Sequence, residues 1–198
     1  MIEAEFISKF DDADAVDMSD TTTNITEENI KELHILADRY PQAQSAIIPM
    51  LHLVQSIDGK VSGEGVRHIA RILDLPEAVV LGVVTFYTMF HKEAVGKHLI
   101  GVCTTSLCAV MGGDMVYETV RKHLGLDGEG TTEDGAFTLE RVECNAACDF
   151  APVMMLNWEF MDNMTPRKAI EIIEKLRNDE EVPVSYTHLR AHETREDL

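Results

Sequence analysis

Basic charge, long apolar runs and tryptophan are all scarce in this sequence of 198 residues. Its 17 lysines and arginines face 35 aspartates and glutamates, so the formal net charge is -18 at pH 7. A polyanion must be met by clustered positive charge, so this deficit argues against binding to nucleic acid or to an anionic membrane surface. The longest apolar stretches, such as residues 78–90, are shorter than the roughly 20 residues that cross a bilayer, so no direct membrane insertion is expected.

The first residues, MIEAEFISKF, also lack the features of a targeting segment. A secretory signal needs a basic start and an uninterrupted apolar stretch, and an organelle transit peptide is rich in arginine and poor in acid. We therefore expect a cytoplasmic protein. In a reducing compartment, its four cysteines suit metal binding or thiol catalysis better than a disulfide framework.

No fingerprint of nucleotide binding is present either. The glycine-rich pieces at residues 111–114 and 128–135 match neither G-x-G-x-x-G after a strand nor a P-loop with its lysine. We interpret them as turns and loops that pack near the cysteines, and the methionines, Met111 among them, as core fillers. The chain is therefore not expected to bind NADH by itself.

The residue pattern changes twice in the first half of the chain. Residues 1–24 carry seven acidic residues against one lysine, without a sustained period, which indicates an acidic flexible tail. Residues 25–94 predict a helical bundle, in which helices begin behind Thr26 and Ser62 and at Pro76. The last two predicted helices resemble a helix-turn-helix. DNA binding is nevertheless rejected, because the second of them begins with apolar residues where a recognition helix needs polar and basic ones.

Residues 95–183 alternate between strand and helix patterns, which predicts an α/β or α+β layer. The expected elements are strands at 97–103 and 137–144, one helix over 106–125, a hairpin that turns at Asn157 and Trp158, and a final helix behind Thr165.

Residues 184–198, VSYTHLRAHETREDL, do not continue this pattern. They resemble a translated sequencing adapter, and we treat them as a non-native tail. His188 and His192 are spaced to share a metal on a helix face, but the sequence offers no third ligand of suitable type nearby.

All four cysteines lie in two close pairs, Cys103 with Cys108 and Cys144 with Cys148. Each pair follows a predicted strand, so the four thiolates meet at one end of a layer if the strands share a sheet. Four thiolates suit either a [2Fe–2S] cluster or tetrahedral zinc. The wide spacing favours iron–sulfur, because structural zinc usually takes two-residue gaps. Zinc remains an alternative, as does a thiol oxidoreductase, although neither pair has the C-x-x-C spacing of that class.

Several segments together resemble one family, namely RYPQAQSAIIPMLHLVQ, VVTFYTMF, GKHLIGVCTTSLCAVMGGD, GTTEDGAFTLERVECNAACDFAPVMMLN and the helix after MTP. From about Thr26 to Pro183 the chain is similar to the thioredoxin-like [2Fe–2S] subunit, the E-type subunit, of NADH:quinone oxidoreductase, respiratory complex I. The resemblance implies a helical bundle followed by a thioredoxin-like [2Fe–2S] ferredoxin domain. It also implies that the four cysteines are the cluster ligands. Many members have Leu-Gly where this chain has Asn145 and Ala146.

The resemblance further implies a division of labour between subunits. FMN and NADH bind a neighbouring flavoprotein subunit, and this chain exchanges single electrons with the flavin without a complete active site of its own. The helical region is then expected to clamp onto the flavoprotein, in the peripheral arm of a membrane-associated complex. A similar subunit of a soluble NAD-linked formate dehydrogenase or hydrogenase is the alternative.

Overall fold

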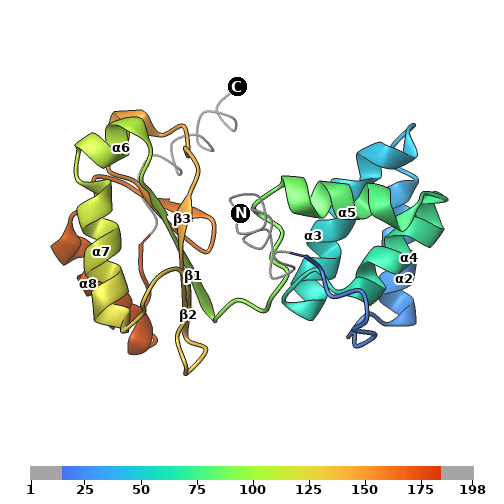
Figure 1. Ribbon diagram of the computed structural model, residues 1–198, viewed down its shortest axis with the longest axis horizontal. Helices are drawn as coiled ribbons and strands as arrows, with labels where there is room; N and C mark the ends of the chain where they lie inside the picture. The colour runs from blue at the N-terminus through green and yellow to red at the C-terminus, as the bar shows by residue number, and fades with distance from the viewer. Residues whose placement is uncertain (1–14, 184–198) are drawn as a thin grey trace, which may run out of the picture. The chain divides into compact units, whose positions relative to one another are not determined.

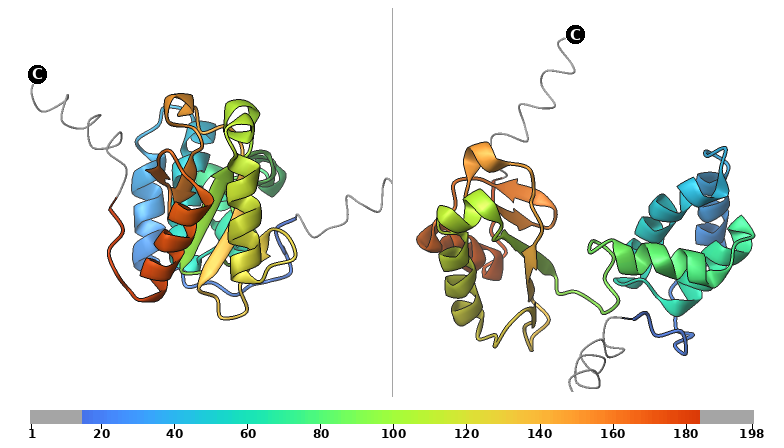
Figure 2. Two further views of the ribbon diagram at one scale, coloured as in Figure 1. Left: turned by 90° about the vertical axis from the view of Figure 1, so that its left-hand side faces the viewer. Right: turned by 45° about the horizontal axis from the view of Figure 1, so that its top comes forward.

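The computed structural model describes residues 15–183, and the chain divides after Ala94 into two compact units (Figures 1 and 2). We call residues 15–94 the helical unit and residues 95–183 the sheet unit. The helical unit contains the α-helices α2 (Glu27–Ala37), α3 (Ile47–Asp58), α4 (Gly63–Leu73) and α5 (Glu77–Phe86), and the 3₁₀ helix η3 (Ala43–Ala46). The sheet unit contains the strands β1 (His98–Cys103), β2 (Gly130–Thr131), β3 (Phe137–Val142), β4 (Met154–Leu156) and β5 (Glu159–Met161), the α-helices α6 (Ser106–Val110), α7 (Gly113–Leu124) and α8 (Pro166–Arg177), and the 3₁₀ helix η4 (Cys148–Phe150).

The helical unit packs around one apolar core to which each of these α-helices contributes. Leu33, Val54, Ile69 and Val84 come from α2, α3, α4 and α5 in turn, and all are 0% exposed. Burying such side chains contributes roughly 1.5–3 kcal/mol each relative to leaving them in water. Among the described residues, no helix is long and apolar enough to span a bilayer.

Helix starts follow the local sequence. Thr26, Ser62 and Thr165 each precede a helix, and the side-chain oxygen of each accepts a hydrogen bond from the backbone N–H three residues further on. These bonds satisfy N–H groups that have no partner within the helix. The capping residues that the sequence predicts are therefore confirmed.

Helix α5 ends at Phe86, although the apolar stretch of residues 78–90, which predicts a helix throughout, continues for one more turn. The following turn is held by α3, where the Gln55 side chain donates to the carbonyl oxygen of Met89 at 3.1 Å and accepts from the His91 N–H at 2.7 Å. Phe90 consequently packs into the helical core with 2% of its surface exposed. A tertiary contact therefore overrides local helix propensity here.

The expected flexible tail is wrong for the part of it that the structure describes, residues 15–24. Val16 is 6% exposed and belongs to the core of the helical unit. The rest of that predicted tail, residues 1–14, lies outside the described residues, as does the suspected non-native tail at 184–198.

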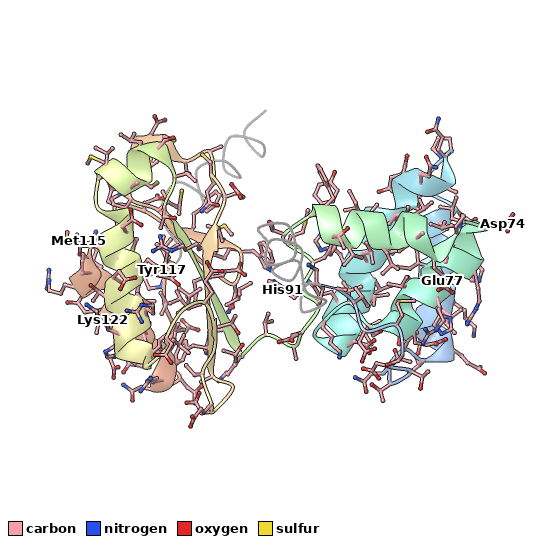
Figure 3. The ribbon with its side chains drawn as sticks, viewed as in Figure 1. Asp74, Glu77, His91, Met115, Tyr117 and Lys122 are labelled. Atoms are coloured by element: carbon pink, nitrogen blue, oxygen red, sulfur yellow. The ribbon has the colours of Figure 1, made fainter. Side chains whose placement is uncertain are left out.

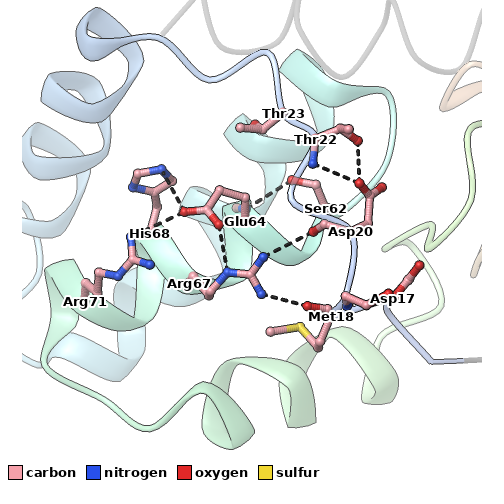
Figure 4. Close-up of polar contacts among 12 residues, drawn as sticks. Asp17, Met18, Asp20, Thr22, Thr23, Ser62, Glu64, Arg67, His68 and Arg71 are labelled. Atoms are coloured by element: carbon pink, nitrogen blue, oxygen red, sulfur yellow. Dashed lines mark hydrogen bonds and ion pairs between the residues drawn. The ribbon is translucent and has the colours of Figure 1, made fainter.

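Polar contacts attach this N-terminal segment to the helical unit (Figure 4). The Arg67 guanidinium donates to the carbonyl oxygens of Met18 at 2.8 Å and Asp20 at 3.2 Å. Glu64 accepts from Arg67 at 2.7 Å, which orients the guanidinium, and Lys60 pairs with the Asp20 carboxylate at 3.2 Å. The number of acidic residues in this segment predicted flexibility, but it could not show that Arg67 and Lys60 of the folded helical unit would bind the segment.

The sheet unit is built on five strands in the order β2-β3-β1-β4-β5. Strands β1 and β3 are parallel at the centre, and the other pairings are antiparallel. Helices α7 and α8 lie side by side on one face of the sheet (Figures 1 and 2), where Val120, Leu139 and Ile173 are 0% exposed. Asn157 and Trp158, with φ of 49° and 73°, form the predicted hairpin turn. This mixed layer confirms the expected α+β fold class.

The single helix predicted over residues 106–125 is wrong, because the chain forms α6 and α7 with a break at Gly112. Gly112 has a φ of 105°, which a residue with a side chain rarely adopts. At Gly113 a Cβ atom would lie 2.5 Å from the carbonyl oxygen of Cys103 and 2.9 Å from that of Cys108. The helix breaks here because Gly113 lies directly against the backbone of Cys103 and Cys108. In the sequence, the Gly-Gly doublet is the local sign of this close contact.

Candidate functional site

The two cysteine pairs meet because β1 and β3 are parallel neighbours. Their register places Cys103, the last residue of β1, opposite Val142, the last residue of β3. Cys144 follows two residues later, Cys108 lies in α6, and Cys148 begins η4. Parallel strands end at the same edge of a sheet, so both pairs lie at one end of the sheet unit. Ala147, which precedes Cys148, packs against the apolar cluster that contains Cys103 and Cys108, so the two pairs are close together.

The cysteines differ in burial. Cys103 and Cys108 are 1% and 3% exposed and pack with Ala151 and Val153 in a small apolar cluster, whereas Cys144 and Cys148 are solvent-exposed. All four are free thiols. The second pair therefore forms the outer side of the candidate site.

Hydrogen bonds favour the thiolate of Cys103. Burial acts to raise the pKa of this thiol, but donors outweigh it and lower the pKa below its ordinary value. The donors are the Thr105 hydroxyl, which lies 3.3 Å from the sulfur, the backbone N–H groups of Thr105 and Asn145, and the Cys108 thiol. The donor from Asn145 belongs to the loop of the other cysteine pair.

The other buried thiol, Cys108, and the exposed thiol Cys148 are harder to ionise. Burial raises the pKa of Cys108, and the adjacent Cys103 sulfur adds to that rise, although the Val153 N–H acts in the opposite direction. The charge of Cys144 raises the pKa of Cys148. Four thiolates so close together are stabilised by a positively charged metal centre, which is the chemistry that this donor set fits.

Each cysteine loop contains one residue in a left-handed backbone conformation. Ser106 has a φ of 37° and Ala146 a φ of 54°. Such a residue turns successive N–H groups to one side and forms a concavity for anions, as found around iron–sulfur clusters. The Ala146 N–H already donates to the Cys144 sulfur at 3.4 Å. Both loops therefore combine sulfur ligands with donors for an anionic group.

One of the two glycine-rich pieces lies where it was expected. Gly113 in the first piece contacts the backbone of both Cys103 and Cys108. The second piece, residues 128–135, is at the other end of the sheet, and its placement near the cysteines is wrong. It includes β2, which pairs with the start of β3 through Thr131 and Thr138. That short strand was not predicted, because two residues carry no periodicity.

Exposed apolar side chains border the cysteines. Leu107, Val110, Met111 and Met115 are between 44% and 83% exposed, so the interpretation of Met111 as a core filler is wrong. Met115 and Tyr117 leave α7 on different sides (Figure 3), and Tyr117 is the buried one at 3% exposure. We call Leu107, Val110, Met111 and Met115 the apolar rim.

Arg141 connects β3 to the first turn of α7, a contact that the sequence did not reveal. It precedes Cys144 on β3 and pairs at 2.7 Å with Asp114, in the first turn of α7. Its guanidinium carbon lies 3.8 Å from the centre of the Tyr117 ring. The hydrogen bond with Asp114 raises the pKa of Arg141.

Residues 33–177 match the sequence family described as thioredoxin-like [2Fe-2S] ferredoxin. The chain belongs to this family, whose cofactor is an iron–sulfur cluster.

The curated relatives are more specific and confirm the resemblance to the E-type subunit. The E subunit of NADH-quinone oxidoreductase from Mycobacterium tuberculosis (strain ATCC 25618 / H37Rv) is 50% identical over 141 residues, which cover 71% of this chain and 56% of that protein. The chain thus spans little more than half the length of this relative. The E subunit from Rickettsia conorii (strain ATCC VR-613 / Malish 7) is 37% identical over 167 residues, which cover 82% of this chain and 100% of that protein.

Among solved structures, an NAD+-reducing [NiFe]-hydrogenase in the air-oxidized state is similar with a TM-score of 0.60. The match covers 69% of this chain and 23% of that one, at 16% sequence identity. At this identity the similarity concerns the fold alone.

Proposed function

We propose that this chain is an electron-transfer subunit that holds one [2Fe–2S] cluster through Cys103, Cys108, Cys144 and Cys148. The observation that carries the proposal is the register of β1 and β3, which ends both strands beside a cysteine pair in a chain of this family. When bound, such a cluster supplies one-electron chemistry.

The arrangement of the thiols favours a binuclear cluster over zinc. A tetrahedral zinc site gathers all four sulfurs around one ion, whereas a [2Fe–2S] core is larger and spreads its four cysteine ligands. Two pairs with internal gaps of four and three residues therefore suit the larger core better.

The charge of the protein also determines in which direction the reduction potential of the cluster is shifted. Four thiolates in a chain of net charge -18 make the addition of an electron harder, which moves the potential toward the negative part of the iron–sulfur range. The apolar packing around Cys103 and Cys108 keeps water from one side of the site. The backbone donors near Ser106 and Ala146 counter part of this charge.

We place the chain in the NADH-oxidising module of NADH:quinone oxidoreductase, in the peripheral arm of that membrane-associated complex. The two E-type relatives, at 50% and 37% identity, support this choice. The hydrogenase supports only the fold, so a soluble hydrogenase or formate dehydrogenase is the weaker alternative. NADH delivers a hydride and the cluster takes single electrons, so a flavin on a partner flavoprotein must stand between them.

Both units offer a surface for that flavoprotein. The apolar rim borders the cysteines, where a partner's flavin would have to approach, and Phe86 of the helical unit is 77% exposed. Exposed apolar residues of this kind mark interaction sites. Met115→Glu and Phe86→Glu should each weaken co-purification with the flavoprotein and leave the iron content unchanged. Full retention by the Phe86 variant would contradict the helical clamp.

The proposal is tested first by metal content. The full chain, purified without oxygen, should be red-brown and contain about two irons and two sulfides. Cys108→Ala should lose nearly all of the iron, because an open coordination position admits solvent. Val110→Ala, on the same helix but exposed, is the matched control and should keep it. Zinc in place of iron, or full iron in the Cys108 variant, would contradict the proposal.

Electron transfer is tested by comparing which reductants can reduce the cluster. NADH alone should not reduce the isolated chain, whereas dithionite should bleach its visible absorption. Adding the flavoprotein should make reduction by NADH observable. Rapid reduction by NADH of rigorously flavin-free protein would show that this chain binds the nucleotide itself.

A further inference from the structure

Asn145 places a buried, unpaired hydrogen-bond donor between two candidate ligands. The residue follows Cys144 in the loop that leads to Cys148. Its Nδ2 atom has neither solvent access nor a hydrogen-bond partner within the described part of the chain. Buried donors of native proteins are nearly always satisfied, so this one indicates a partner that the chain itself does not supply.

The backbone of the same residue shows what surrounds it. Its backbone N–H lies near enough to the sulfur of Cys103, which belongs to the other pair, to lower the pKa of that thiol. The adjacent N–H of Ala146 donates to the sulfur of Cys144 at 3.4 Å. Asn145 therefore lies between the two pairs, and the acceptors that a bound group would add there are anionic sulfurs.

On the basis of the proposed function, we propose that Asn145 tunes the cluster by donating a hydrogen bond from Nδ2 to one of its sulfurs. Reduction adds one electron and increases the negative charge on the sulfurs, while the proton stays on the amide nitrogen. Hydrogen bonds to anionic acceptors are stronger, so the donor stabilises the reduced form more than the oxidised form. Asn145 therefore raises the reduction potential of a site whose charge otherwise lowers it.

Two substitutions of nearly equal size separate donation from packing. Asn145→Leu removes the donor and keeps the volume, and it should lower the equilibrium constant for one-electron reduction about tenfold, which corresponds to about 59 mV. Asn145→Asp puts an acidic oxygen in place of the donor and should lower the constant further. Asn178→Leu is the matched control, because Asn178 follows Arg177, which stacks on Phe137 at the opposite end of the sheet. It should leave the potential unchanged.

The measurement is an EPR-monitored redox titration of the full chain with its cluster. The expected order of potentials is wild type, then Asn145→Leu, then Asn145→Asp, from highest to lowest. A potential in the leucine variant equal to or above that of the wild type would overturn the inference.

Unfolding of the iron-free chain gives an independent readout. Without a cluster the amide has no partner, so Asn145→Leu should leave the denaturant midpoint unchanged or raise it. A general loss of packing would lower that midpoint together with the potential, and this outcome would also count against a tuning role. If the wild type holds no iron at all, the proposed function fails. If it holds the cluster and the leucine variant shows no shift, only the inference about Asn145 fails.

Discussion

A group of charged side chains in the helical unit is paired internally, whereas the sheet unit leaves a buried donor beside the cysteines without a partner among the described residues. In the helical unit, Glu64 binds Arg67, His68 and Arg71, and Arg67 in turn holds the N-terminal segment (Figure 4). In the sheet unit, burial and neighbouring sulfurs raise the pKa values of Cys108 and Cys148, and the Asn145 amide nitrogen has no hydrogen-bond partner among the described residues. Strain and unmet interactions gather at functional sites because a ligand compensates for them.

The largest expected contrast between the units comes from two glycines. Gly113→Ala puts a Cβ atom against the backbone of Cys103 and Cys108, so we expect a loss of about 2–4 kcal/mol in unfolding free energy and of iron content. Gly82→Ala, in α5, meets no atom within 4 Å and should stabilise the helical unit by about 0.5–1 kcal/mol. Denaturant unfolding of both variants measures the difference in unfolding free energy. An equal change in both variants would contradict the expected difference between the two units.

The units should also respond oppositely to pH. Burial raises the pKa of Glu140 in β3 to about 7, and the charge of Glu129 adds to the rise. A raised carboxyl pKa favours the protonated folded form, so this stabilisation is complete below about pH 4.5 and is lost as the pH rises through 7. Glu140→Gln should therefore stabilise the sheet unit at pH 8, by up to about 3 kcal/mol.

Glu64 provides the opposite case in the helical unit. The hydrogen bond from Arg67 lowers the pKa of Glu64 below 4.5, so its stabilisation is present at neutral pH and is lost as the pH falls through the lowered pKa. Glu64→Gln should therefore destabilise at pH 7 and lose its effect in acid. Urea midpoints of both glutamine variants from pH 3 to 9 test the pair. A Glu140 variant without pH dependence would remove the contrast.

Releasing the N-terminal segment should affect only the helical unit. Arg67→Ala removes bonds to Glu64 and to two backbone carbonyls, so it should cost about 1–3 kcal/mol and speed amide exchange in residues 16–24. Arg71→Ala removes an ion pair whose arginine side chain is 63% exposed, and should cost less than about 1 kcal/mol. Hydrogen exchange by mass spectrometry separates the two. A changed cluster potential in the Arg67 variant would contradict the independence of the units.

The smallest expected effect concerns backbone strain in the sheet unit. Ala146 has a φ of 54°, which costs an L-residue about 1–2 kcal/mol, so Ala146→Gly should stabilise the folded chain by up to about 1 kcal/mol. The greater freedom of glycine in the unfolded chain offsets part of this gain. Thermal unfolding of the iron-free protein measures it. A lower melting temperature would show that this loop is not strained.

The sequence by itself determined the local features of the protein. The helix caps at Thr26, Ser62 and Thr165 depend on one side chain and a nearby N–H, so residue type and spacing suffice to predict them. The hairpin turn at Asn157 and Trp158 was predictable for the same reason. The two cysteine pairs are also visible in the sequence, and their spacing favours an iron–sulfur cluster over zinc.

Tertiary structure decided what depends on residues far apart in the chain. The parallel register of β1 and β3 brings Cys103 and Cys144 to one edge, and the contacts made by Arg67 turn an acidic segment into an attached one. Gln55 stops α5, and the carbonyl groups beside Gly113 divide a predicted single helix. Each of these outcomes depends on a residue far away in the sequence or on two backbone segments that lie close together. Neither kind of contact leaves a periodic pattern of residues, so the sequence could not predict it.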